Sequence, residues 1–422
     1  MMIFIVMALS WLNMSAYDVP DRNWYDPEAA NADSLTVSLL TAYPGPQVYE
    51  LYGHEGIRVK GMGIDSVWNY GVFDFRAPNF IYRFVKGETD YMCTGVKTAW
   101  FLREYDLRTS TVVEQDLNLT QEEARKILEL LRRDALPENR TYRYNYVKDN
   151  CATRILDRLD QGVSSPIVYP DSIPYSTFRN EMRAYNKDYP WYQLGIDIAL
   201  GSGIDYPINS RESMFVPMEM MKKASQARML DGRPLVRDSK EILEGLQDAT
   251  LGPTSPLLRP LPVFILLTVL VLVVVIRDLR RMILTRWVYW LWFFLLGLVG
   301  CVVWFLIFCS SHEATSPNFL LLWFSPLQLA TAVLMISRKT EKAALVMCLY
   351  NIVVVLATLL VWPFQQQSAN PVFFLMMAIT LMLALSFAIV IYNLIYTSRS
   401  KEYYKMHPRP WLIQLILRKK DK

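Results

Sequence analysis

The sequence predicts an α+β extracytoplasmic domain followed by an all-α membrane domain of about five transmembrane helices. Hydrophobic residues make up 52% of the 422 residues, and the mean hydropathy is +0.15. This composition is too apolar for an ordinary soluble domain and too charged for a purely membrane-embedded one. Charged residues are concentrated before residue 277 and in short clusters after it, so the charged sequence and the long apolar runs belong to different parts of the chain.

The distribution of charge excludes one class of partner for the first part. Residues 277–422 carry 15 Lys and Arg against 5 Asp and Glu, whereas residues 1–276 carry 29 against 35. Nucleic-acid binding requires a basic surface that neutralises phosphates. Because the first part is acidic, we expect no nucleic-acid partner.

Five apolar runs predict the membrane domain at residues 261–396, with spans at residues 261–276, 287–308, 319–336, 343–362 and 372–396. Lys and Arg follow the first, third and fifth runs, whereas the two other connecting loops, residues 310–318 and 363–370, contain neither. Basic loops remain on the cytoplasmic side of a membrane. We therefore expect a multi-pass inner-membrane protein whose basic tail, residues 397–422, is cytoplasmic and whose large domain is outside.

The N-terminal segment supports this orientation. Residues 1–16 contain an apolar stretch followed by small residues, which is typical of a signal peptide or an N-terminal anchor. Residues 17–252 then form the extracytoplasmic domain, and residues 253–260 link it to the first span.

Within this domain, alternation and β-branched or aromatic content predict strands at residues 36–40, 56–59, 66–75 and 109–117. Thr120 and Glu123 form a capping-box pattern that starts a helix. A second helix should begin at Asn150 and Cys151 and turn Ile155 toward the core.

Histidine occurs only three times, at His54, His312 and His407, so the soluble domain has one candidate imidazole. His54 lies beside glycines at the start of a predicted strand, where it is accessible enough to act as a base. A structural role fits the same position. His407 lies in the predicted tail, and we expect it to take no part in catalysis.

Cys151 follows two residues that are suited to capping a helix, Asp149 and Asn150. At the first position of a helix, the dipole and the free N–H groups favour a thiolate and are able to hold an oxyanion. The alternative is a buried structural cysteine. We expect Cys93 to be buried, and Cys93 and Cys151 to remain free thiols rather than a disulfide.

A thiolate nucleophile needs an imidazole to accept its proton, and the imidazole needs a polar group to orient it. Asn69 lies in the strand that follows His54 and is a candidate for this third role. Asp65 and Tyr70 compete for it.

The predicted order of elements is a strand with His, a next strand with a polar residue, and a helix that begins with Cys. This order resembles the circularly permuted papain-like fold of NlpC/P60-type and lecithin:retinol acyltransferase-like enzymes. The chain more specifically resembles the bacterial Lnb family of lipoprotein N-acyltransferases. The stretches that carry the resemblance are residues 52–58, 68–75, 145–153, 194–205 and 311–327.

The resemblance implies that Cys151 is the nucleophile, His54 the base and acid, and Asn69 the orienting residue. It implies a phospholipid as the acyl donor and diacylglyceryl-cysteine lipoproteins as acceptors, with the acyl group passing through a Cys thioester. Both substrates are anchored in membrane lipid, which suits a catalytic domain tethered at the periplasmic face of the inner membrane.

Three further residues are candidates for substrate binding. Arg58 could pair with a lipid phosphate, although an arginine more often pairs with a carboxylate. His312 and Asn318 lie in a predicted outer loop, where they could bind a head group, or where His312 could simply be solvated. No zinc-ligand spacing or phosphate-binding glycine loop is present, so neither a metal nor a cofactor is implied.

Two other functions fit the same layout. A membrane-bound cysteine peptidase or amidase that cleaves cell-wall peptides would keep the Cys and His chemistry but would need a polar cleft. A non-enzymatic membrane sensor would not need Cys151 or His54. A transporter is poorly supported because the spans carry no intramembrane charge.

Overall fold

The computed structural model describes residues 31–45, 47, 50–73, 78–170, 176–245 and 253–397. The predicted export segment, the end of the strand predicted at residues 66–75 and the predicted basic tail from residue 398 onward lie outside the described residues. The description below therefore concerns the folded α+β part and the apolar helices.

The chain forms two compact units. The first extends to Gln193, resumes from Ile204 to Pro253 and includes Ser311–Ala314. The second contains Leu194–Gly203, Thr254–Ser310 and the chain from Thr315 onward. Each unit thus takes one short segment from the sequence range of the other, which the predicted domain boundaries do not include.

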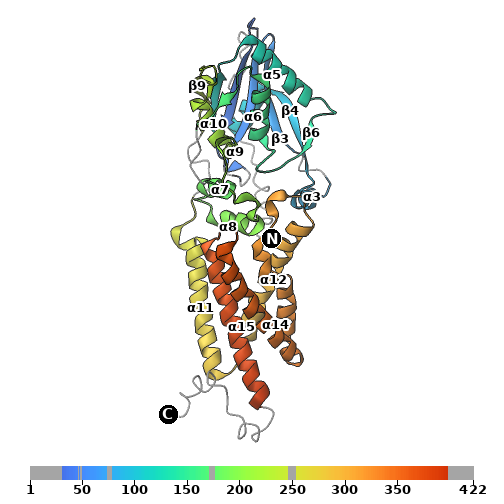
Figure 1. The fold of residues 1–422 in the computed structure, drawn as a ribbon, viewed down its shortest axis with the longest axis vertical. Coiled ribbons are helices and arrows are strands. Elements are labelled where there is room, and N and C mark those ends of the chain that lie inside the picture. The colour runs from blue at the N-terminus through green and yellow to red at the C-terminus, as the bar shows by residue number, and fades with distance from the viewer. Residues whose placement is uncertain are drawn as a thin grey trace. The chain divides into compact units, whose positions relative to one another are not determined.

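A single antiparallel sheet of seven strands forms the centre of the described part of the first unit, in the order β6-β4-β3-β2-β1-β5-β9 (Figure 1). The strands are β1 Thr36–Ala42, β2 His54–Gly61, β3 Ile64–Val72, β4 Asp90–Lys97, β5 Val112–Leu117, β6 Thr141–Arg143 and β9 Val236–Leu243. A separate pair, β7 Ile167–Val168 and β8 Arg228–Met229, connects two loops. Four of the seven strands were predicted; β4, β6 and β9 were not.

The helices before the apolar segments are α3 Phe80–Lys86, α4 Thr98–Leu107, α5 Gln121–Asp134, α6 Cys151–Gly162, α7 Phe178–Tyr185, α8 Pro190–Ala199, α9 Ser210–Ser213 and α10 Pro217–Gln226. Of these, α8 continues into the second unit from Leu194 onward. The predicted capping box of Thr120 and Glu123 starts α5, and α6 begins at Cys151 as expected. The α+β fold class predicted from the sequence is confirmed.

Alternation along β2 gives the sheet two different faces. Ile57 and Val59 point into the main core, where they meet apolar side chains of α5 and α6. These two helices lie side by side against the sheet (Figure 1). On the opposite face, Val67 of β3 packs with Phe101 and other side chains of α4 in a smaller core.

Arg58 is a charged side chain buried in the α4 face. It is 6% exposed and donates from Nε and Nη2 to the two carboxylate oxygens of Asp65, both at 2.7 Å, and from Nη1 to Glu114 at 2.9 Å. Thr98 donates to the same Asp65 at 2.5 Å. These contacts tie β2, β3, β5 and the start of α4 together.

The buried position of Arg58 leads to a stability prediction. Arg58→Met should lower the free energy of unfolding of the first unit by about 3–5 kcal/mol, because Asp65 stays buried without its cation. Arg143 pairs with Asp90 at 3.2 Å on the surface, so Arg143→Met should cost less than about 1 kcal/mol. Hydrogen exchange of β2 and β3 amides in the detergent-solubilised chain measures both. Equal, small losses of protection in the two variants would contradict this account.

The described part of the second unit contains five helical segments that are long and apolar enough to cross a membrane. They are α11 Pro260–Arg281, α12 Arg286–Phe308, α13 Leu327–Ile336 together with the preceding η6 Phe319–Leu322, α14 Glu341–Val361 and α15 Pro371–Thr397. Gly300 lets α12 approach the start of α13 closely, since a Cβ there would lie 2.6 Å from the Ser325 carbonyl carbon. Gln328 and Asn351 join α13 and α14 through a 2.6 Å hydrogen bond. The predicted all-α membrane domain is confirmed.

The segment Leu194–Gly203 is bonded to two loops of the second unit. Asn318 Nδ2 donates to the carbonyl of Ile198 at 2.9 Å, and Asn370 Nδ2 donates to the buried carboxylate of Asp197 at 2.8 Å. Gln367 Nε2 donates to Asn318 Oδ1 at 3.1 Å. The amide of Asn318 thus holds protein segments together in this structure.

Candidate active site

The N-terminus of α6 is fixed by Asn150. Its side-chain oxygen accepts from the N–H groups of Ala152 and Thr153, each at 3.0 Å, and the Thr153 hydroxyl accepts from the Asn150 N–H at 2.8 Å. The Asn150 amide nitrogen also donates to the Phe215 carbonyl at 2.8 Å. This reciprocal cap sets Cys151 as the first residue of the helix.

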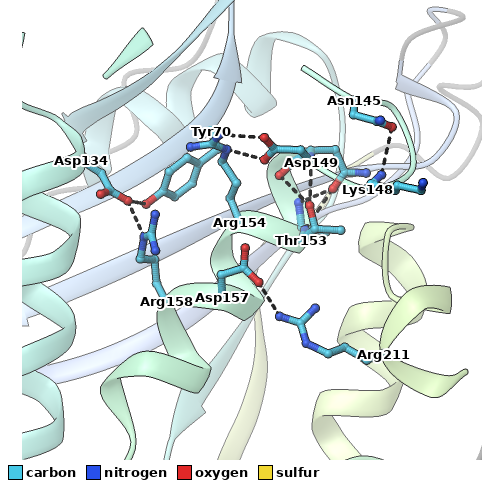
Figure 2. A network of polar contacts seen from close by, with 12 residues as sticks. Tyr70, Asp134, Asn145, Lys148, Asp149, Thr153, Arg154, Asp157, Arg158 and Arg211 are labelled. Atoms are coloured by element: carbon cyan, nitrogen blue, oxygen red, sulfur yellow. Dashed lines mark hydrogen bonds and ion pairs between the residues drawn. The ribbon is translucent and has the colours of Figure 1, made fainter. Parts of the chain in front are cut away.

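Ion pairs along α6 then anchor the helix to its surroundings (Figure 2). Arg154 donates to both carboxylate oxygens of Asp149, at 2.5 and 2.8 Å. Arg158 pairs with Asp134 of α5, and the same carboxylate accepts from the hydroxyl of Tyr70 on β3 at 2.7 Å. The helix that presents Cys151 is therefore tied to the preceding loop, to α5 and to the sheet.

His54 and Asn69 lie together on the α4 face of the sheet. His54 is the first residue of β2, and Gly56, two residues later, is paired with Asn69 of β3. His54 Nε2 is 3.1 Å from Asn69 Oδ1, and the imidazole stacks on the Tyr105 ring with centroids 6.2 Å apart. Because the amide oxygen only accepts, Nε2 carries the proton and Nδ1 of the neutral ring is the acceptor.

Burial decides the charge of the imidazole. It lowers the pKa of His54 below the ordinary 6.5, while the hydrogen bond to Asn69 and the charge of Glu104 raise it and Arg108 lowers it. His54 is accordingly neutral near pH 7, the state in which it accepts a proton.

Burial also has the largest effect on the pKa of the Cys151 thiol. It raises the pKa of Cys151 to about 11, although the N–H groups of Glu55 and Ala152 and the hydroxyl of Tyr144 are directed at the sulfur and lower it. The helix N-terminus had predicted a stabilised thiolate, which is wrong for this buried position. The sulfur therefore stays protonated near pH 7, and only a nearby base would make it a nucleophile.

The sulfur of Cys151 lies near the Glu55 N–H at a place where the strand pairing of the sheet is interrupted. The β2–β3 pairing ends at Gly56 and Asn69, and the β3–β4 register shifts between Asn69 and Val72. Gly71 lies in this break with a φ of +87°, where a Cβ would stand 3.3 Å from the Tyr144 ring and 3.8 Å from Cys151 Cβ. The irregularity leaves room for Cys151 beside the residue that follows His54.

Two family models match the chain. The model of the Lnb N-terminal periplasmic domain matches residues 21–184, and the model of the Lnb transmembrane domain matches residues 253–397. The chain belongs to the Lnb family. Comparisons with curated proteins and with solved structures give no match. This Lnb family member is a membrane protein with a periplasmic N-terminal domain and apolar helices after it.

Of the three candidates for orienting His54, Asn69 is the one that the structure places beside the ring. Asp65 is bonded to Arg58, and Tyr70 donates to Asp134. A phosphate-binding role for Arg58 remains a prediction, and its donors are already taken by buried carboxylates. His312 belongs to the first unit, where its Nε2 lies 2.9 Å from the carbonyl of Phe84 at the end of α3.

Sequence reasoning missed Glu55 as part of the site. It is fully buried, and its Oε2 accepts from the Thr41 hydroxyl at 2.8 Å. Burial raises the pKa of this carboxyl well above its ordinary value, although the hydrogen bond from Thr41 lowers it. The available signal was its phase: Glu55 is two and four residues before Ile57 and Val59, so it shares their core-facing side of β2.

Among the residues that the structure describes, no group of three or more His, Cys, Asp or Glu side chains is arranged to hold a metal ion. Cys93 and Cys151 are free thiols. The chemistry available to the site is that of a thiol, an imidazole and directed N–H groups.

The raised pKa of Cys151 predicts how its reactivity depends on pH. A thiol whose pKa is raised to about 11 holds little thiolate below that pH, so alkylation by iodoacetamide should rise continuously from pH 6 to 10 without an acidic plateau. Peptide mass mapping measures the rate, with Cys151→Ser as the blank. A plateau between about pH 5 and 8 would instead reveal a preformed thiolate–imidazolium pair, contrary to this prediction.

Proposed function

We propose that this Lnb family member is a lipoprotein N-acyltransferase. It moves a fatty acyl chain from a phospholipid, through a thioester on Cys151, to the α-amine of a diacylglyceryl-cysteine lipoprotein. The observation that carries the proposal is Cys151 at the start of α6, directed at the N–H of the residue that follows His54, whose ring is bonded to Asn69.

In the first half-reaction, Cys151 attacks the carbonyl carbon of a phospholipid ester while His54 Nδ1 accepts the thiol proton. The carbon–sulfur bond forms and the carbon–oxygen bond breaks. His54 then gives the proton to the departing oxygen, which releases lysophospholipid. Because the free thiol has a raised pKa, proton removal accompanies attack rather than preceding it.

In the second half-reaction, the α-amine of the lipoprotein attacks the thioester carbonyl. The carbon–nitrogen bond forms, the carbon–sulfur bond breaks, and the amine proton returns through His54 to the sulfur. A thioester suits this step because it is reactive toward amines and can still be formed from an oxygen ester. The N–H groups of Glu55 and Ala152, which are directed at the sulfur, are the donors we assign to the oxyanion.

The membrane layout supports lipid substrates. Both the donor and the acceptor are anchored in a bilayer, and the periplasmic domain shares its chain with the apolar helices. Basic clusters after the first, third and fifth spans support a cytoplasmic C-terminus. We accordingly assign the protein to the inner membrane, with its catalytic domain at the periplasmic face.

Intact-mass analysis of the full-length protein in phospholipid nanodiscs tests the thioester. The wild-type chain should gain a hydroxylamine-sensitive acyl group, and Cys151→Ala should gain none. His54→Gln should slow the gain by about 10²–10⁴-fold because the base is lost. Asn69→Ala should slow it less, since the imidazole remains.

Cys93→Ser is the matched control, because Cys93 is also a buried thiol of the same sheet domain and should be dispensable. The trapped thioester is then given a diacylglyceryl-cysteine peptide, which should leave with the acyl group as an amide. A folded wild-type chain that never acquires the adduct would contradict the proposal and favour peptide hydrolysis or sensing.

A further inference from the structure

Five aromatic rings form a continuous row through the first unit, which we call the aromatic row. It runs from Phe84 and Phe80 of α3 to Phe73 after β3, Tyr91 of β4 and Tyr144 before α6. Successive ring centroids are separated by 5.9, 5.6, 5.1 and 4.3 Å. Contacts of this length are those of packed aromatic side chains.

One end of the aromatic row reaches the nucleophile. The Tyr144 hydroxyl lies close to Cys151, where it lowers the pKa of the thiol. The Tyr144 ring also borders the break in the sheet, since a Cβ at Gly71 would stand 3.3 Å from it. A molecule lying along the row would have its end at the reacting sulfur.

The other end is an apolar surface. No residue of α3 is buried, and Ile81 and Tyr82 are 59% and 55% exposed. Phe73, Phe80, Phe84 and Tyr144 are themselves only partly buried. Exposed apolar side chains are unfavourable in water, and where several occur together they are typical of a surface that meets an apolar partner.

Chain connectivity points to lipid as that partner. The Ser311 N–H donates to the Lys86 carbonyl at 2.8 Å, and the Ser311 hydroxyl donates to the Gly87 carbonyl at 2.9 Å. Ser311 follows Phe308, the last residue of α12, by three residues, which the chain spans in at most about 10 Å. Because α12 is long and apolar enough to cross a membrane, the loop that is bonded to α3 continues along the chain directly into a candidate membrane span.

The charges beside the row are paired. Arg83 is bonded to Asp90 at 2.7 Å, and Lys86 to Glu88 at 2.7 Å. Rings with neutralised flanking charges suit a hydrocarbon chain better than a peptide or a free phosphate.

We propose that the aromatic row binds the acyl chain of the donor phospholipid, with the ester at Cys151 and the distal end of the chain at α3. This inference rests on the proposed function and identifies the acyl chain as the part of the substrate that the aromatic row recognises. A chain laid along the rings brings its ester to Cys151, so the row selects for long acyl chains.

Chain-length selectivity tests the proposal. The rate of thioester formation on the full-length protein is measured with dipalmitoyl and with dioctanoyl phosphatidylethanolamine, each supplied in mixed detergent micelles. Phe80→Ala should lower the palmitoyl rate about tenfold, because apolar contact with the distal part of the chain is lost. The octanoyl rate should change little, since a short chain does not extend to α3.

Trp100→Ala is the matched control, because Trp100 is an aromatic residue of α4 that lies outside the row and is 72% exposed. It should leave both rates unchanged. Phe80→Leu, which keeps an apolar side chain, should recover most of the palmitoyl rate. A merely structural role for Phe80 would lower both rates together.

Two results overturn the inference in different ways. Equal effects of Phe80→Ala on both donors, or no effect, would remove the aromatic row from the substrate site and leave the acyltransferase proposal intact. A wild-type protein that forms no adduct with either donor would overturn the proposed function itself, and the inference with it.

Discussion

The arrangement of the site depends on one irregularity, the break in the β2–β3–β4 pairing at Gly71. The β2–β3 pairing stops at Gly56 and Asn69, and a Cβ at Gly71 would stand 3.8 Å from Cys151 Cβ, so the first residue of α6 lies close to this break. Gly71, with its positive φ, ends the regular pairing while keeping both strands in the sheet. The sulfur of Cys151 then lies near the backbone N–H of Glu55 on β2.

Several other features follow from this placement. A buried helix N-terminus needs hydrogen-bond partners for its free N–H groups, and the Asn150 cap provides them. The ion pairs of Arg154 and Arg158 fix the helix to neighbouring segments. The burial of this position also changes the pKa values of the candidate site residues. Burial raises the pKa of the Cys151 thiol and lowers that of the His54 imidazole, so both groups are neutral near pH 7. Under the proposed function, such an enclosed site would limit hydrolysis of the thioester by limiting access to water.

Local sequence signals were sufficient to predict the elements that carry the candidate site residues. Alternation predicted β2 and β3, and the cap residues predicted the start of α6. In contrast, β9 was missed because most of its residues are exposed, which leaves no alternation of buried and exposed positions. The N–H of Glu55 at the sulfur and the bonding of Ser311 to α3 were also missed. Both depend on contacts between residues far apart in the chain, which no local pattern encodes.

The most direct test of this account changes Gly71 alone. Gly71→Ala is compared with Gly63→Ala, which has a similar φ of +77° but no atom within 4 Å of the added Cβ. Both variants bear the backbone strain of a positive φ. If the break positions Cys151, alkylation of Cys151 and thioester formation should fall about tenfold or more in Gly71→Ala and stay near wild type in Gly63→Ala, at comparable unfolding temperatures. Equal reactivity of the two variants would contradict the dependence of the site on this break.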